Sequence, residues 1–463
     1  MALLLALSVA LMLLAGLLGP SATLPEGDWP VRLGDPGDLP VIALLWSSLL
    51  LGLGGTLLGL RRAGPEPGSG TARGLFLFGT ASAVVLALVP PLGSTDLMDY
   101  ATYGRLAVLG HNPHEWTPAD LRSLGDPVAL LSSEAWRNTP SVYGPVATAV
   151  QWGAALLGGG SAAAIVLVLK LVNALSFVAA GAVLTRLTSP VRAHLLWTAN
   201  PLMLWAVCAG GHLDGLATAA AIGFLYLLLR GHPLVAGVLL GCASAVKAPF
   251  ALFASAALVT PGRRCPDAGP VAVGAAAVLL AGYAAVGTAA VRALAERGGT
   301  WSFLSPWLQL NRWVPVGSWL PWAAAALLAW VFLRGLPDGP REVRTVLALA
   351  LAWVLTTPIY HPWYDVMLFG ALAIMPASRL DTVLALRGTA TALCVLPGVR
   401  LSSPWLSDAG NSASTSVPLV LLAFTLLVAV MAGRGAFGAA PVPLPPPGAP
   451  LEPAGAGLRQ SGT

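Results

Sequence analysis

Residues 74–100 of the chain read GLFLFGTASAVVLALVPPLGSTDLMDY. The first part, 74–92, is almost wholly apolar, and a helix that crosses a bilayer needs roughly 20 such residues. The polar part that follows directly carries Asp96 and Asp99, and carboxylates are costly to place at a membrane exit. We therefore expect a membrane-spanning chain whose first long loop, residues 93–145, lies at the membrane surface and carries a reaction centre.

The composition of the whole chain supports this class. Of its 463 residues, 56% are hydrophobic and 10% are charged, and the mean hydropathy is +0.76. Soluble domains carry about 25% charged residues. The formal net charge of +5 comes mostly from arginines at the ends of apolar segments, so it reports topology rather than nucleic-acid binding. The predicted fold class is an all-α polytopic membrane protein.

Several common kinds of site are missing from the sequence. The four cysteines are scattered without a CxxC spacing, which favours neither a zinc site nor a disulfide framework. Walker A, GxGxxG and HExxH patterns are also absent, so nucleotide hydrolysis and zinc peptidase chemistry lack support. The sequence therefore predicts no metal and no cofactor.

Apolar stretches predict about 11 to 14 transmembrane helices. Residues 1–19 lack the basic start and the Ala-x-Ala site of a signal peptide, so we expect a retained first helix. Residues 141–157 are apolar but short, which favours a juxtamembrane helix. The expected spans are 1–19, 40–60, 74–92, 161–187, 193–211, 214–230, 268–290, 317–335, 345–359, 363–378, about 383–399, and 415–433.

Residues 234–260 are too long for one span and contain Lys247-Ala-Pro249 at their middle. A proline beside an intramembrane charge favours a hairpin of two half-length helices that meet at Lys247. Residues 1–434 form the predicted membrane domain. The Pro-, Gly- and Ala-rich segment 435–463 is predicted to be a disordered cytoplasmic tail.

Arginines set the predicted orientation. With the N-terminus in the cytoplasm, most arginines fall on the inner side, as the positive-inside rule requires, although Arg387 and Lys170 lie within apolar segments. The same orientation collects the unusual polar residues and many tryptophans on the outer face. Those tryptophans are either interfacial anchors or platforms for sugar rings; they are Trp116, Trp136, Trp301, Trp307, Trp313, Trp319, Trp363 and Trp405.

Asp96 and Asp99 are the first candidates for catalysis. A carboxylate just outside the bilayer can accept a proton from an attacking hydroxyl, and a low local dielectric raises its pKa. The alternative is a helix N-cap. We expect Asp99 to be the better cap and Asp96 the better base.

A second group of residues is suited to bind an anion or a sugar. Lys247 must meet an anion, pair, or reach the interface, and a phosphate oxygen is a suitable partner. His212 and Asp214 follow the helix break at Asn200-Pro201 and either cap a helix or form a polar wall. His361 and Asp365 flank Pro362-Trp363-Tyr364 at a helix entrance, and His361 and Tyr364 are candidates for binding the donor; the alternative is an interfacial aromatic anchor with a helix cap. Arg312 is a further phosphate candidate on an outer loop.

The order of these motifs resembles that of the GT-C glycosyltransferases. It is most similar to the actinobacterial polyprenol-phosphomannose-dependent α-1,6-mannosyltransferases (MptB-like). The motifs that carry the resemblance are Asp96-Leu-Met-Asp-Tyr100, Gly104 with Gly110-His-Asn-Pro113, Pro140-Ser-Val-Tyr143-Gly-Pro145, Asn200-Pro-Leu202 with Gly210-Gly-His-Leu-Asp214, Lys247-Ala-Pro249, and His361-Pro-Trp-Tyr364.

The resemblance implies a GT-C-like bundle with short juxtamembrane helices in loop 93–145. It also implies an inverting enzyme that moves a sugar, expected to be mannose, from a polyprenyl-phosphate donor to a glycan or glycolipid hydroxyl. Asp96 would be the general base, on the outer face of the plasma membrane. Residues expected to serve the acceptor or its loop are Tyr100, His111, Asn112, His114 and Tyr143.

Two other functions remain open at this point. A flippase or transporter for lipid-linked glycans would also have a broken helix and an intramembrane charge, but its polar residues would lie near the bilayer midplane. A non-catalytic assembly subunit predicts that Asp96, His212, Lys247 and His361 are far apart in space.

Overall fold

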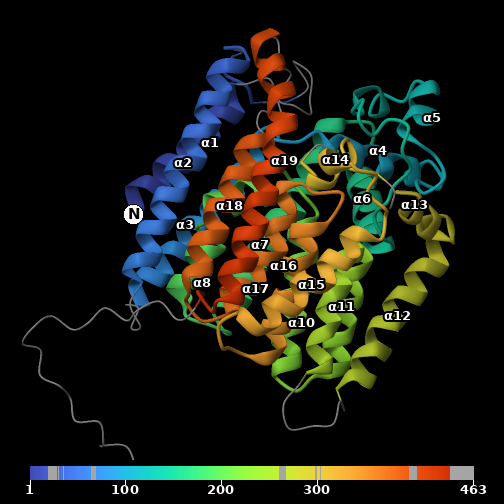
Figure 1. Cartoon of the computed structure of the whole chain (residues 1–463). Helices are drawn as coiled ribbons and strands as arrows, with labels where there is room; N and C mark the ends of the chain where they lie inside the picture. The colour runs from blue at the N-terminus through green and yellow to red at the C-terminus, as the bar shows by residue number, and fades with distance from the viewer. Residues whose placement is uncertain are drawn as a thin grey trace, which may run out of the picture.

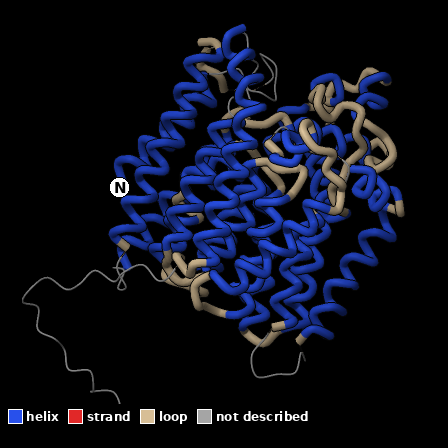
Figure 2. The backbone as a smooth tube through the Cα atoms, viewed as in Figure 1, coloured by secondary structure: helices blue, strands red, loops and turns tan. Residues whose placement is uncertain are grey.

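The computed structural model is a bundle of helices (Figures 1 and 2). It describes residues 1–18, 29, 31–34, 36–63, 69–259, 267–297, 300–302, 304–395 and 404–437. Within these residues every regular secondary-structure element is a helix. The all-α class is therefore confirmed, while most of the predicted disordered tail, from residue 438, lies outside the described residues.

Five of the described helices are long and apolar enough to cross a membrane. They are α2 (Asp38–Arg62), α3 (Ser69–Leu88, apolar from Gly70), α7 (Ala162–Leu184), α12 (Ala268–Val286) and the Ser416–Gly433 part of α19 (Pro404–Gly433). A broken pair bent by 115°, Pro201–Ala209 with α10 (Asp214–Leu229), passes as a sixth. Shorter apolar helices make up further expected spans: Ala2–Leu18, Pro233–Val246, Ala248–Leu258, Leu320–Gly335 and Pro362–Ile374. The chain is thus a polytopic membrane protein.

Helix α1 (Ala2–Leu18) packs along α2 through a polar clamp. The Ser8 hydroxyl donates to the Ser48 carbonyl at 2.6 Å, and the Ser48 hydroxyl donates to the Ser8 carbonyl at 2.7 Å. Small hydroxyl residues let apolar helices approach and bond within a membrane. The first predicted span is therefore part of the bundle.

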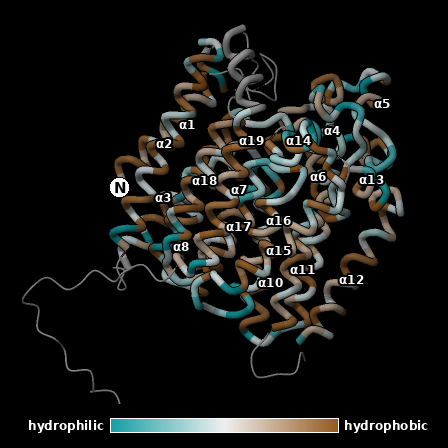
Figure 3. Tube along the Cα trace, in the orientation of Figure 1, coloured by the Kyte–Doolittle hydropathy of each residue, from teal (hydrophilic) through white to brown (hydrophobic). Residues whose placement is uncertain are grey.

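The first long loop carries the expected short helices. These are α4 (Asp96–Val108), α5 (Pro118–Ser123), the 3-10 turn η1 (Ala129–Leu131) and α6 (Pro145–Gly158). A Cβ atom on Gly104 would lie 2.1 Å from the Gln151 carbonyl oxygen, so only glycine allows α4 and α6 to pack this closely. Figure 3 shows hydrophilic residues gathered around α4 and α5, beside a largely hydrophobic bundle.

The lysine within the α7 span has a structural partner. The Lys170 amine donates to the Val89 carbonyl at 2.6 Å, just beyond the end of α3. Three residues further along α7, the Asn173 amide donates to the Gly211 carbonyl at 2.9 Å. Both side chains thus donate to backbone carbonyls that lack a partner within a helix. An unpaired carbonyl costs free energy within a membrane, so these bonds stabilise the fold.

The expected span 193–211 is not one straight helix. It comprises the end of α8 (Pro190–Leu196), the short α9 (Pro201–Met203) and a π-helical turn η2 (Leu204–Ala209). Proline cannot continue the preceding helix, and the Asn200 side chain accepts from the Leu202 amide at 3.1 Å to begin a new one. The sharp bend after η2 then places residues 210–213 at the centre of the fold.

The predicted break at Lys247 is confirmed. Helix α11 (Pro233–Val246) ends there, and the 3-10 helix η3 (Ala248–Leu258) begins directly after it. Cβ atoms on Gly237 and Gly241 would contact Val271 and Ala275 of α12 in the same order, so α11 and α12 are parallel.

The chain must therefore return between α11 and α12, and η3 makes that return. Its 11 residues rise about 22 Å at 2.0 Å each, against about 21 Å for the 14 residues of α11. The segment that follows Lys247 thus covers the height of α11 with fewer residues.

The C-terminal half contributes the remaining walls. Its elements are α13 (Ala289–Arg297), α14 (Pro306–Asn311), α15 (Leu320–Gly335), α16 (Arg341–Thr356), the 3-10 turn η4 (Pro362–Tyr364), α17 (Asp365–Ile374), α18 (Arg379–Val395) and α19. Arg387, which stood out within its apolar segment, pairs with the buried Asp365 at 2.5 Å and donates to the Tyr360 hydroxyl at 3.0 Å. This pair ties α18 to the segment that carries His361 and Tyr364.

Candidate active site

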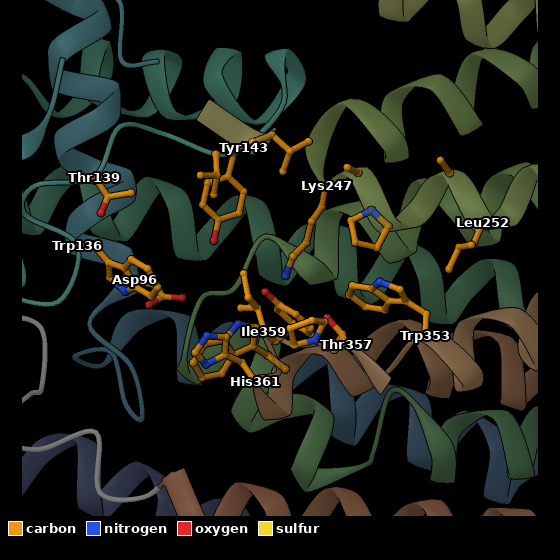
Figure 4. Close-up of a pocket in the computed structure, with 18 of the residues that line it drawn as sticks. Asp96, Trp136, Thr139, Tyr143, Lys247, Leu252, Trp353, Thr357, Ile359 and His361 are labelled. Atoms are coloured by element: carbon orange, nitrogen blue, oxygen red, sulfur yellow. The ribbon is translucent and has the colours of Figure 1, made fainter. Parts of the chain in front are cut away.

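One cavity of about 620 Å³ lies between the outer loop, the start of η3, and helices α15 and α16 (Figure 4). Segments far apart in the sequence converge on it. Its polar lining comes from the start of α4, the loop before α6, Lys247 and the η4 region. Among the predicted residues, Asp96, Asp99, Tyr100, Tyr143, Lys247, His361 and Tyr364 line it.

Asp96 is the first residue of α4, outside the candidate spans. The Tyr100 hydroxyl donates to its Oδ2 at 3.4 Å, and His212 Nδ1 lies 3.6 Å from the same oxygen. Burial raises the pKa of Asp96 to about 6, and the bond from Ser94 and the charge of Lys247 oppose that rise. A carboxylate with this pKa is ionised at neutral pH and is a better base than an exposed aspartate.

Asp99 is one turn further along α4. We expected it to be the helix cap, but the N-cap is Thr95, and Asp99 instead accepts from the Ser133 hydroxyl at 2.8 Å and the Ser133 amide at 3.3 Å. The helix begins earlier than the pattern suggested, so Asp99 is free to fasten a distant loop. Burial, followed by the charge of Asp96, raises its pKa to about 7.

Two tyrosines extend the polar surface from Asp96. The hydroxyls of Tyr100 and Tyr143 are 2.9 Å apart, and the rings meet edge to face with centroids 5.0 Å apart. Burial raises the pKa of both phenols well above the ordinary value, so both remain neutral donors. Together with Asp96 they offer a row of groups to a hydroxylated ligand.

Lys247 forms a buried ion pair with Asp214. Its Nζ lies 2.7 Å from Oδ1 and 2.9 Å from Oδ2 of Asp214, and 3.7 Å from the centroid of the Tyr364 ring. An ammonium has three donors, so the pair uses two and leaves one. The Asp214 side chain is only 3% exposed, whereas Lys247 lines the cavity. Asp214 therefore positions the cation from behind.

Three rings form a column beside Asp96. Trp363 stacks on His212 with centroids 3.8 Å apart and on His361 with centroids 4.7 Å apart. His361 faces the cavity, and the edge of Trp136 approaches it at 6.5 Å. His212 lies behind the cavity wall at 1% exposure, so it contacts Asp96 rather than a ligand.

Four predicted residues lie away from the cavity. His111 stacks on Trp116 at 3.8 Å, the Asn112 amide donates to the Val286 carbonyl, and the buried His114 bonds Ser141 and Thr148. Arg312 donates to Gln309 on α14. The His111 contact lies within the outer loop, whereas Asn112 and His114 connect the loop to α12 and α6. Within the described part of the chain, no group of three or more His, Cys, Asp or Glu side chains is placed to hold a metal ion.

Comparison with known families covers more than half of the chain. Residues 5–261 match the family model described as alpha-(1→6)-mannopyranosyltransferase, N-terminal domain. The chain belongs to this alpha-(1→6)-mannopyranosyltransferase family. The match runs from α1 through η3, so it includes Asp96, His212, Asp214 and Lys247. The other wall of the cavity, from α15, α16 and η4, lies beyond it.

Individual relatives of this mannopyranosyltransferase-family chain are distant. A probable alpha-(1→6)-mannopyranosyltransferase of Mycolicibacterium smegmatis is 29% identical over 153 residues, 32% of this chain and 27% of the relative. An alpha-(1→6)-mannopyranosyltransferase of Mycobacterium tuberculosis is 29% identical over 151 residues, which are 32% of this chain and 26% of the relative. Alpha-(1→6)-mannopyranosyltransferase B of Corynebacterium glutamicum is 26% identical over 189 residues, which are 37% of this chain and 31% of the relative. The matches thus cover less than a third of each relative, and no solved structure matches.

Sequence reasoning about this family member missed part of the cavity. Tyr103, Trp322, Trp353, Thr356 and Thr357 also line it. Tyr103 lies between the motif residues Tyr100 and Gly104, and the other four come from largely apolar stretches without a local motif. Only the packing of α16 against η3, and of α15 against α16, brings most of them to the site. A faint signal was available for Thr356 and Thr357, since a polar pair ends an otherwise apolar helix just before Tyr360.

Proposed function

We propose that the protein transfers a mannosyl residue from a polyprenyl-phosphate donor to a glycan or glycolipid hydroxyl, with inversion at the anomeric carbon. The observation that carries this proposal is that one cavity contains the Asp96 carboxylate, the Lys247 ammonium and an apolar extension. Family membership supports mannose as the sugar and an α-1,6 linkage as the product. The sequence resemblance supports the lipid donor.

The chemical roles follow from the positions of these groups. The acceptor oxygen attacks the anomeric carbon and forms the new glycosidic bond while its proton passes to Asp96. The bond between the anomeric carbon and the phosphate oxygen breaks, and the phosphate leaves with the electron pair. Lys247 compensates the charge that develops on that oxygen.

The apolar end of the cavity suits the hydrocarbon tail of the donor. Leu252, Leu294, Trp322 and Trp353 line it. Trp322 is 65% exposed and Leu294 is 37% exposed, so this end opens on the surface of the bundle, where the bilayer would be. A prenyl chain can reach the cavity from the lipid without crossing polar surface.

We propose that the site faces the extracytoplasmic side of the plasma membrane, and the arginine distribution supports an outer position for loop 93–145. The proposed partners are a polyprenyl-phosphate sugar and an oligosaccharide or glycolipid acceptor. A flippase would have its polar residues near the bilayer midplane, and it is disfavoured because Asp96, Lys247 and His361 share one cavity beside the outer loop.

A reconstituted assay tests the proposal. Purified protein in nanodiscs is incubated with polyprenyl-phosphate mannose and a labelled α-1,6-mannotriose, and the products are analysed by mass spectrometry. We expect an acceptor longer by one hexose. If lipid-linked mannose instead crosses the membrane of proteoliposomes without any elongation, the protein is a transporter and the proposal fails.

The rate of transfer should depend on pH through Asp96. Because the pKa of Asp96 in the free enzyme is raised to about 6 and a base acts only when ionised, we expect kcat/KM at pH 5 to be about a tenth of a plateau reached above about pH 7. The bond from Tyr100 lowers this pKa, so Tyr100→Phe should move the midpoint to higher pH. The measurement is kcat/KM from about pH 5 to about pH 8; a flat profile would contradict the assignment.

A further inference from the structure

The cavity is ordered from one end to the other. Figure 4 shows Trp136 and Thr139 on one side of Asp96, and Lys247 followed by Leu252 on the other. In an inverting transfer the base and nucleophile approach the face of the sugar opposite the leaving group. If the donor phosphate lies at Lys247, the attacking hydroxyl must arrive from the side of Trp136.

We propose that the segment Ser132–Pro140 is the acceptor-binding shelf, on which a neutral sugar ring stacks against Trp136 and donates a hydroxyl hydrogen bond to Asp99. This inference rests on the proposed function and gives its second substrate a position and a chemistry. None of the residues named earlier for the acceptor, apart from Tyr100 and Tyr143, lines the cavity.

The shelf is fastened to α4 at two points. The Ser133 hydroxyl and amide both bond the Asp99 carboxylate, and the Tyr103 hydroxyl donates to the Thr139 carbonyl at 2.8 Å. Trp136 lies between these two points. The segment is therefore attached to the helix that carries the proposed base, so a sugar on Trp136 would have a fixed position relative to Asp96.

The chemistry of this end favours an uncharged ligand. Asp96 and Asp99 lie here, and the lining ammonium, Lys247, lies on the opposite side of Asp96. Arg137 of the shelf acts on Asp99 but donates to the Ser132 carbonyl and does not line the cavity. Carboxylates accept hydroxyl protons but repel an anionic group. An aromatic face suits the C–H face of a pyranose, and a Trp or Tyr beside polar groups is typical of surfaces that are partly wet. A neutral hexose at the end of a glycan combines these features.

Steady-state kinetics with each substrate varied in turn test the shelf. We compare Trp136→Ala with the conservative Trp136→Phe and with Trp319→Ala, a control at a residue that is 68% exposed and does not line the cavity. Trp136→Ala should raise the acceptor KM about tenfold while kcat and the donor KM stay within about twofold. Trp136→Phe should recover most of the loss, and the control should match the wild type.

Two outcomes would overturn the shelf: an unchanged acceptor KM in Trp136→Ala, or a donor KM that rises instead. Calorimetric titration of α-1,6-mannotriose into the protein separates this inference from the proposed function. If the wild type transfers no mannose, the function fails, but the shelf still predicts that the wild type binds mannotriose and that Trp136→Ala does not. If the wild type does not bind mannotriose, the proposal of an acceptor-binding shelf is wrong.

Discussion

Asp96→Asn is expected to lower kcat by about 10²- to 10⁴-fold while the KM of the donor changes little. Asparagine fills the same space but cannot accept the proton of the attacking hydroxyl. The measurement is single-turnover transfer with purified variant and polyprenyl-phosphate mannose. Asp120→Asn, on the same outer loop but exposed and outside the cavity, is the matched control and should remain active.

Stability measurements separate a lost base from a misfolded variant. The pKa of Asp96 is raised in the folded protein, so between its ordinary value near 4 and about 6 the native state binds more protons than the unfolded state. Ionised Asp96 therefore weakens the fold, and stability falls as pH rises through that window. Asp96→Asn removes this cost, so its Tm at pH 8 should equal or exceed that of the wild type.

Asp99 provides the sharpest comparison for this assignment. It lines the same cavity, but its carboxylate is fastened to Ser133. Asp99→Asn should therefore reduce the affinity for the acceptor and leave appreciable kcat. A larger fall in kcat for Asp99→Asn than for Asp96→Asn would exchange the roles of the two carboxylates.

Sequence patterns indicated most of the polar groups at the site, because a polar or charged side chain among apolar membrane residues costs free energy and therefore stands out. Asp96, Lys247 and His361 stand out against apolar surroundings, and each does line the cavity. The break at Lys247 could also be predicted, since proline and a buried charge both oppose a continuous helix. Composition alone predicted an all-helical membrane fold.

The partners of those groups could not be read from the sequence. Lys247 had to meet some anion, yet nothing local selects Asp214 over a ligand, and Arg387 gave no hint that it pairs with Asp365. The free-energy cost of burying a charge shows only that the charge has a partner. The bend after η2 and the packing of η3 decide which side chain is that partner. The apolar walls from α15 and α16 were also missed, because only tertiary packing brings these residues to the cavity.

Lys247→Met is expected to damage both the fold and the reaction, and the structure allows the two effects to be separated. Loss of the ammonium leaves the buried Asp214 carboxylate unpaired, which costs about 3–5 kcal/mol of stability. A double variant, Lys247→Met with Asp214→Leu, contains neither charge and should regain most of that stability, because apolar residues can replace a buried pair.

The double variant then isolates the role of the cation in the reaction. If Lys247 binds the donor phosphate, the double variant folds but its donor KM stays raised by about ten- to a hundredfold, since a charge-assisted hydrogen bond contributes about 1.5–3 kcal/mol. Lys247→Arg should retain part of the affinity. Urea denaturation measures the stability and donor titration measures the KM. A stable double variant with both the donor KM and kcat of the wild type would show that Lys247 only balances Asp214, and the phosphate would have to bind elsewhere in the cavity.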